Sequence, residues 1–156
     1  MEKIYPTYNE IHNECIDYAN SIIAQGIKFD CVIGLAHGGI FPSMLISRVL
    51  DVPLRIIHYS SSRGQGDNKD STKIQTIRIL RNQKILLVDD IVDSGWTLKE
   101  MCEFYESFDN EVTSYAVFYK MLKEPIHIPN YSIGIPEDAG WVCFPFEELG
   151  HIGNEL

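Results

Sequence analysis

The sequence predicts an α/β fold: one domain with a mainly parallel, twisted sheet, helices on its faces and a small C-terminal cap, or hood. Runs rich in Val and Ile alternate with amphipathic segments, as expected for parallel strands joined by helices. One such run is followed by a glycine turn and a helical segment, the start of a βαβ unit. The length of 156 residues and the 45% hydrophobic content suit one domain, which we place at 1–156.

The first predicted element is a helix that begins after Thr7. Thr7 and Glu10 have the spacing of a capping box, and Gly26 ends the helical pattern. The apolar residues between these points recur at helical spacing, which predicts one buried face. They are Ile11, Cys15, Ala19, Ile22 and Ile23.

A strand, a helix and a second strand are expected next, at 29–35, 36–50 and 53–59. The helical segment opens with a glycine turn. Its proline, Pro42, falls in the first turn of the helix, where a missing N–H group is tolerated.

The segment 60–72 contains no aliphatic or aromatic side chain. It is too short to separate domains, and its composition is typical of a mobile loop over a site. The elements expected after it are a strand or hairpin arm at 74–80, a strand at 84–89, a helix at 97–108 and a strand at 112–119.

The C-terminal segment, 131–150, begins with one more predicted strand, 131–135. Aromatic and turn residues follow it. This composition favours a cap over one edge of the sheet.

The charge and the apolar runs exclude two classes of partner. A net charge of -9 argues against nucleic acid, because such binding needs clustered Lys and Arg. A small anionic ligand would need local cations, backbone N–H groups or a metal ion. No run approaches the roughly 20 apolar residues that cross a bilayer, and the N-terminus lacks a secretion signal. We therefore expect a cytoplasmic protein that binds neither nucleic acid nor membrane.

The 4 cysteines are scattered and form no Cys-x-x-Cys pair. This distribution predicts free, mostly buried thiols, and it disfavours disulfides and zinc ligands.

Three carboxylates, Asp89, Asp90 and Asp93, follow a predicted strand directly. Ligands of parallel α/β sheets bind beyond the carboxyl ends of the strands, so this position favours a functional site. The structural alternative is that Asp93 or Ser94 caps the next helix. Capping needs only one of these residues, and the surplus of acids favours function.

The turn after the acid pair is suited to a phosphate group. Gly95 allows the backbone to approach an anion closely, and the N–H groups of Asp93–Thr97 would line a concavity at a helix N-terminus. Ser94 and Thr97 add hydroxyl donors.

The run from Ile85 to Thr97 resembles the phosphoribosyl pyrophosphate (PRPP) motif of type I phosphoribosyltransferases. The resemblance implies that Asp89 and Asp90 hold the ribose hydroxyls and support Mg²⁺. It also implies a 5′-phosphate site, whose residues would be Asp93, Ser94, Gly95, Trp96 and Thr97. Trp96 occupies the motif's variable position, where a solvent or subunit contact is the alternative role.

The resemblance extends over about 29–148, most closely to the short xanthine-guanine and hypoxanthine phosphoribosyltransferases. It implies a pyrophosphate loop at Ala36, His37 and Gly38, with Arg63 and Lys69 of the polar loop closing on the pyrophosphate. The family usually has Arg or Lys where this chain has His37. That difference predicts pH-dependent charge at the loop, because imidazole titrates near pH 6.5. The alternative for His37 is a neutral histidine in a turn. The alternative for Arg63 and Lys69 is that they are solvated cations of a loop.

The purine-binding residues implied by the resemblance are Lys120, Trp141 and Val142. Lys120 would donate to the purine O6, Trp141 would stack on the base, and the Val142 carbonyl would meet its edge. Glu147 corresponds to an acid that helps bind a second Mg²⁺. The alternatives are a loop cation for Lys120, a core or rim position for Trp141 and a surface position for Glu147.

Together these features imply a purine salvage enzyme that transfers the phosphoribosyl group of PRPP to N9 of hypoxanthine, guanine or xanthine. In this interpretation Asp93 lies near the purine N7 and handles the base proton. Relatives in the family imply a homodimer or homotetramer. Two alternatives stay open: a PRPP- or nucleotide-sensing regulator of the same fold, and a phosphoribosyltransferase for adenine or a pyrimidine.

Overall fold

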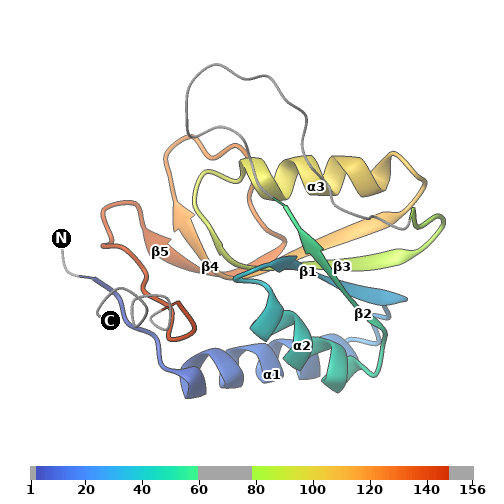
Figure 1. Cartoon of the computed structure of the whole chain (residues 1–156), viewed down its shortest axis with the longest axis horizontal. Helices are drawn as coiled ribbons and strands as arrows, with labels where there is room; N and C mark the ends of the chain where they lie inside the picture. Colours follow the sequence, from blue (N-terminus) through green and yellow to red (C-terminus); the bar gives the residue numbers. More distant parts are fainter. Residues whose placement is uncertain (1–2, 60–78, 148–156) are drawn as a thin grey trace, which may run out of the picture.

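The computed structural model describes residues 3–59 and 79–147. They form a five-stranded sheet in the order β2-β1-β3-β4-β5, and every neighbouring pair of strands is parallel. Helices α1 and α2 cover one face and α3 covers the other (Figure 1). The predicted α/β fold is therefore confirmed. The elements are α1 (Tyr8–Ala24), β1 (Cys31–Ala36), α2 (Ile40–Leu50), β2 (Leu54–His58), β3 (Lys84–Val92), α3 (Trp96–Glu106), β4 (Glu111–Met121) and β5 (Tyr131–Pro136).

The capping box at the start of α1 is confirmed. The Thr7 hydroxyl accepts a hydrogen bond from the Glu10 N–H at 3.2 Å, and the Glu10 carboxylate accepts one from the Thr7 N–H at 2.7 Å. The predicted apolar face was wrong at Ile23, which is 52% exposed. Ile22 already fills the inward position, and the next residue is rotated by about 100° around the helix. Tyr18 completes the buried face and stacks on Tyr115.

Strand β3 is longer than predicted, because it continues past Asp89 to Val92. Its pairing with β1 ends at Val88, opposite Gly34, whereas its pairing with β4 continues to Val92, opposite Tyr119. Asp89 and Asp90 therefore lie on the part of β3 that pairs with β4 alone. The side of β3 that faces β1 is open there and has room for other groups beside these carboxylates.

The other predicted helices and strands of the described residues are confirmed within small shifts of their ends. Pro42 lies in the first turn of α2, α3 begins one residue earlier than expected, and β4 extends to Met121. The predicted loop at 60–72 lies outside the described residues. So does nearly all of the predicted arm at 74–80, and the described residues 79 and 80 are not in a strand.

The C-terminal cap is tied to the N-terminal segment. Ile4 forms a parallel bridge with Val142, and its N–H donates to the Trp141 carbonyl at 3.0 Å. The Cys143 N–H donates to the Ile4 carbonyl at 2.8 Å. The two ends of the described chain thus hold the cap beside the sheet.

The cysteines are free, as expected, and those at positions 15, 31 and 102 are buried. Among the described residues, no helix combines the length and the apolar character needed to span a bilayer.

Candidate active site

Polar residues gather at the carboxyl ends of β1, β3 and β4. Because the strands are parallel, these ends meet at one edge of the sheet. The loop after β1, the end of β3 and the turn into α3 supply most of the residues singled out by the sequence.

Neither Asp93 nor Ser94, in the turn between β3 and α3, caps the helix. The N-cap of α3 is Gly95, in a left-handed conformation with φ of 92° and no capping side chain. The alternative in which Asp93 or Ser94 caps this helix is therefore wrong. The Asp93 side chain is 64% exposed.

Gly95 is required at this turn for a second reason. A Cβ atom there would overlap the backbone of His127, in the loop after β4. The same loop is fixed by a hydrogen bond from the Ile126 N–H to the Ser94 carbonyl at 3.0 Å. The turn into α3 therefore packs closely against the loop after β4.

A cavity of about 150 Å³ opens at the N-terminus of α3. The first N–H groups of a helix have no partners within the helix, and they point out of its N-terminal end. This cavity can therefore accept an anion such as a phosphate. Its lining residues are Asp89, Ile91, Val92, Asp93, Ser94, Gly95, Trp96, Thr97 and Leu98.

Among the described residues, no cationic side chain forms an ion pair with Asp89 or Asp90. Burial and the neighbouring Asp90 carboxylate raise the pKa of Asp89 well above its usual range. Burial also raises the pKa of Asp90, and the Glu147 carboxylate adds to this effect. The Asp89 carboxylate accepts the Asp90 N–H at 2.9 Å, and the Asp90 carboxylate accepts the Ile91 N–H at 2.7 Å.

The loop after β1 packs directly on Asp90. A Cβ atom at Gly38 would overlap the Asp90 carboxylate, so only glycine permits this approach. The predicted pyrophosphate loop and the predicted ribose-binding acids are therefore neighbours in space. The Ala36–His37 peptide bond in this loop is cis.

His37 has a neighbour that the sequence analysis did not single out. His58, the last residue of β2, lies opposite Ala36 in the sheet register. Its imidazole meets that of His37 edge to face, with ring centroids 5.0 Å apart. Both side chains are exposed. The signal in the sequence was the predicted order of strand, helix and strand at 29–59. Such a unit pairs its two strands in parallel, which places their ends side by side.

A second, smaller cavity of about 60 Å³ adjoins the turn. The Lys120 ammonium lies 3.5 Å from an Asp93 carboxylate oxygen and 6.0 Å from the centre of the Trp141 ring. Lys120 is a strand residue with a side chain that is only 17% exposed, so the loop-cation alternative is wrong. Trp141 is 66% exposed, a rim position. The lining residues are Ile91, Asp93, Lys120, Trp141, Val142, Phe144 and Glu147.

The structure therefore brings most of the predicted residues together. Asp93 lines both cavities, and Glu147 lines the smaller one and accepts the Phe144 N–H at 3.1 Å. Trp96 stands in the first turn of α3, with the Lys99 ammonium 5.6 Å from its ring centre. Ile91 and Phe144 also line the smaller cavity and were missed, because nothing in their local sequence separates them from core residues.

Two predicted residues, Arg63 and Lys69, lie outside the described residues. Their part in the site stays a prediction.

Comparisons with known proteins agree with this arrangement. A family model described as "Phosphoribosyl transferase domain" matches residues 7–147. The chain is 24% identical to the xanthine-guanine phosphoribosyltransferase of Roseobacter denitrificans, over 90% of this chain and 83% of that protein. It is 25% identical to the protein of that name from Nitratidesulfovibrio vulgaris strain DP4, over 93% and 85%. Among solved structures, a purine phosphoribosyltransferase from Pyrococcus horikoshii superposes with a TM-score of 0.78 and 27% identity, over 94% of this chain and 95% of that one.

Proposed function

This chain belongs to the phosphoribosyl transferase domain family, and on that premise we propose that it is a purine salvage phosphoribosyltransferase. It transfers the 5-phosphoribosyl group of PRPP to N9 of a 6-oxopurine: hypoxanthine, guanine or xanthine. The products are the nucleoside 5′-monophosphate and pyrophosphate. The xanthine-guanine phosphoribosyltransferases among its relatives support the choice of a purine.

One observation carries the proposal: two adjoining cavities share Asp93, and each suits a different end of a nucleotide. The cavity at the N-terminus of α3 offers backbone N–H groups and the hydroxyls of Ser94 and Thr97 to a 5′-phosphate. The cavity beside Lys120 offers an ammonium group, an aromatic ring and a carbonyl to a base. A ribose between them would lie along the end of β3.

The chemistry of the acid pair fits Mg²⁺. Asp89 and Asp90 supply hard oxygen ligands whose negative charge is only partly relieved by backbone N–H groups. Among the described residues, no three metal-ligating side chains converge. This donor set suits Mg²⁺, which usually takes one or two carboxylates and completes its shell with substrate oxygens and water. We assign Glu147, whose charge acts on Asp90, to a second ion.

When bound, Mg²⁺ would polarise the diphosphate of PRPP as a leaving group. The protein's own contribution at that end is the loop at Ala36, His37 and Gly38. Its backbone N–H groups and the His37 imidazole would bind the diphosphate oxygens, and the contact of Gly38 with Asp90 keeps them beside the ribose.

Lys120 selects the oxo group of the base. An ammonium is a donor only, so it can bind the O6 of a 6-oxopurine and would face the donor amino group of adenine. The Val142 carbonyl accepts from the base edge, and Trp141 lies at the rim, where its face can stack on the purine.

Asp93 handles the proton of the base. Its carboxylate lies 3.5 Å from the Lys120 ammonium. A purine that entered between them would meet Lys120 with O6 and Asp93 with N7, so the ligand would replace the ion pair with two hydrogen bonds. Asp93 can then hold the proton that leaves the base as N9 attacks C1′.

We assign this activity to the cytoplasm, where free thiols persist. We also propose that the protein is a homodimer or homotetramer. Exposed apolar side chains on α2 and on the edge strand β2 support self-association. They are Ile40, Met44, Leu54 and Ile56.

Product formation from radiolabelled bases tests the function. Purified protein, PRPP and Mg²⁺ are incubated separately with hypoxanthine, guanine, xanthine, adenine, uracil and orotate. We expect monophosphates of the 6-oxopurines alone. Efficient conversion of adenine or a pyrimidine would reassign the base, and tight PRPP binding without any product would favour a sensing regulator.

A further inference from the structure

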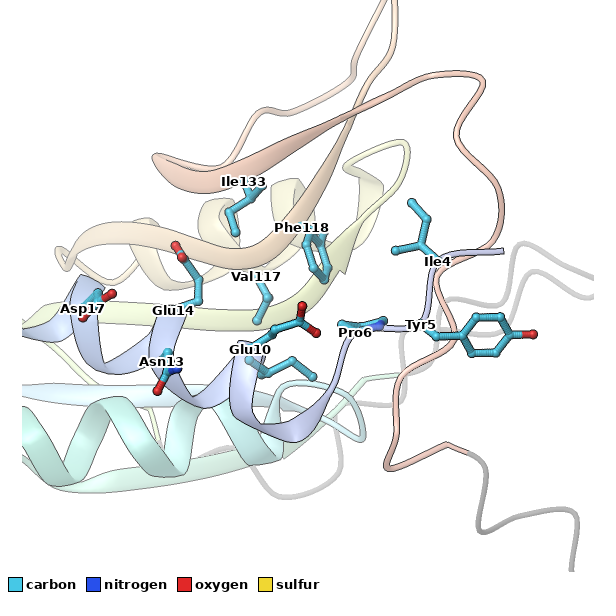
Figure 2. Close-up of a pocket in the computed structure, with 11 residues that line it drawn as sticks. Ile4, Tyr5, Pro6, Glu10, Asn13, Glu14, Asp17, Val117, Phe118 and Ile133 are labelled. Carbon is cyan, nitrogen blue, oxygen red and sulfur yellow. The ribbon is translucent and has the colours of Figure 1, made fainter. Parts of the chain in front are cut away.

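A separate cavity of about 510 Å³ lies between α1 and the strands β4 and β5 (Figure 2). None of its lining residues lines either cavity of the candidate active site. Its volume falls within the roughly 300–1,000 Å³ that is typical of small-molecule sites. The residues that line it are Ile4, Tyr5, Pro6, Glu10, Ile11, Asn13, Glu14, Asp17, Val117, Phe118 and Ile133.

One wall of the cavity is apolar. Val117 and Phe118 of β4 and Ile133 of the edge strand β5 face the gap above α1 (Figure 2). Ile133 is 38% exposed, whereas Ile135, two residues further along β5, is buried in the core that includes α1. An apolar body placed here would cover surface that now meets water.

The opposite wall is acidic. Glu10, Glu14 and Asp17 recur at helical spacing on α1, so their carboxylates lie along one side of the helix. Figure 2 shows the side chains of Glu10 and Glu14 on the side of α1 that faces the strands. These acids and the apolar wall therefore border the same space.

No cation of the described residues neutralises this wall. The ion pairs among the described residues join Lys84 to Glu111, Lys99 to Glu103 and Lys120 to Asp93. None of these residues lines the cavity.

The half-buried Glu14 makes the lack of a cation unfavourable. Burial and the neighbouring Asp17 raise the pKa of Glu14, so its ionised form is disfavoured. Glu10 stays ionised, because hydrogen bonds from Thr7 lower its pKa. A cation beside Glu14 would relieve the repulsion, whereas an anion would add to it.

We propose that this cavity binds a small organic cation, with an apolar body against Val117, Phe118 and Ile133 and an ammonium or guanidinium group beside Glu14 and Asp17. The apolar wall requires the apolar body, and the acidic wall requires the positive charge. A purely apolar ligand would leave the carboxylates unpaired, and a metal ion or a bare polyamine would leave the strand wall exposed. The inference does not depend on the transferase activity.

A titration of methyl-labelled protein followed by two-dimensional NMR tests the site. The probes are 4-phenylbutylamine, its alcohol analogue and 4-phenylbutyrate, which share one apolar body and differ in charge. We expect the amine to shift the methyl signals of Ile4, Val117 and Ile133 in a saturable way, with a dissociation constant of about 1 mM or lower. The alcohol should bind about tenfold more weakly, which corresponds to one charge interaction. The carboxylate should not bind.

Two variants and a matched control assign the charge. Glu14→Gln and Asp17→Asn should each weaken amine binding by up to about tenfold, with unchanged thermal melting as the check of folding. Glu124→Gln removes an exposed carboxylate elsewhere and should leave binding unchanged. Equal binding of amine and alcohol, full binding to both variants, or no shift of these methyl signals at 10-fold the expected dissociation constant would each overturn the proposal.

Discussion

Asp89 shows, at the scale of a single residue, a conflict between stability and binding. Its pKa is raised by burial and by Asp90, so ionisation of the folded chain is disfavoured. Because the pKa of Asp89 is raised on folding, the free energy of unfolding depends on pH at this residue. The protonated Asp89 is compatible with the fold at low pH, and stability is lost as the pH rises above 3.8, the pKa of the unperturbed group.

Replacing Asp89 by Asn should therefore raise the melting temperature of the ligand-free protein. We expect a rise of about 2–4 °C, the shift that about 1 kcal/mol produces in a chain of this size. The same variant should lose at least about tenfold in affinity for PRPP with Mg²⁺ if Asp89 is the ligand of the ion that we propose. Thermal melting and calorimetric titration measure the two effects. A lower melting temperature would show that the carboxylate stabilises the fold.

Asp93 offers a cleaner test of the chemistry, because its side chain is 64% exposed and its loss should spare the fold. Asp93→Asn should lower kcat by about 10² to 10⁴, the usual contribution of acid–base assistance. Steady-state kinetics with saturating PRPP and base give the result. Near-normal turnover would remove the proton-handling role and leave Asp93 as a phosphate-loop residue.

His37 tests the role of charge at the predicted pyrophosphate loop. His37→Arg places a permanent positive charge beside the diphosphate, so the KM for PRPP should fall by up to about tenfold. Steady-state kinetics with saturating base measure the KM. An unchanged KM in this variant would show that charge at this position does not contribute to PRPP binding.

At the scale of elements, the β3–α3 turn depends on the backbone of one residue. Gly95 has a φ of 92°, and a Cβ atom there would strike His127. Gly26, after α1, has a φ of 70° and nothing within 4 Å of a Cβ atom. The two positions share the left-handed conformation and differ in the space available.

Gly95→Ala should therefore cost more than Gly26→Ala. We expect about 1 kcal/mol for Gly26→Ala and about 2–4 kcal/mol for Gly95→Ala, where steric overlap adds to the conformational term. Urea unfolding measures both free energies. Equal losses would show that the loop at His127 moves away at little cost.

At the scale of the whole molecule, burial of titratable groups predicts the behaviour in alkali. Burial raises the pKa of the Cys15 and Cys102 thiols from 9.0 to about 12. Between these values the unfolded chain loses protons that the folded chain keeps. The free energy of unfolding should therefore fall as the pH rises above about 9.

The urea midpoint at pH 8 and pH 10 measures this loss. We expect a decrease in stability of about 1 kcal/mol for each buried thiol over one pH unit above 9. Cys102→Ala should be less stable at pH 8 and should also show a smaller decrease toward pH 10. An unchanged decrease in this variant would assign the effect to other groups, such as the buried tyrosines.

Much of the fold could be predicted because its signals are local. The capping box at Thr7, the alternation of strands and helices and the run from Ile85 to Thr97 each lie within a short stretch of chain. Hydrophobic period and turn chemistry act over such distances. Ile23 shows the limit of such local signals. Its spacing suited the buried face as well as that of Ile22 did, but only Ile22 is buried when the helix packs on the sheet.

The site was predictable in its residue types and less so in its contacts. The acids, the glycine turn and Lys120 could be singled out as chemistry-bearing groups at strand ends. The extension of β3 to Val92 could not be predicted, because beyond Val88 it depends on pairing with β4 alone. His58 was missed because its meeting with His37 depends on the register of two strands.

The sequence by itself determined the family, the order of the elements and the polar residue types at the candidate site, because motif spacing and hydrophobic period act over short stretches of chain. Only the tertiary structure decided that Gly38 lies against Asp90, that Lys120 pairs with Asp93, and that an acidic helix face borders an apolar cavity. These contacts join segments far apart in the chain. They are set by strand register and by the packing of helices on the sheet, which no local pattern specifies.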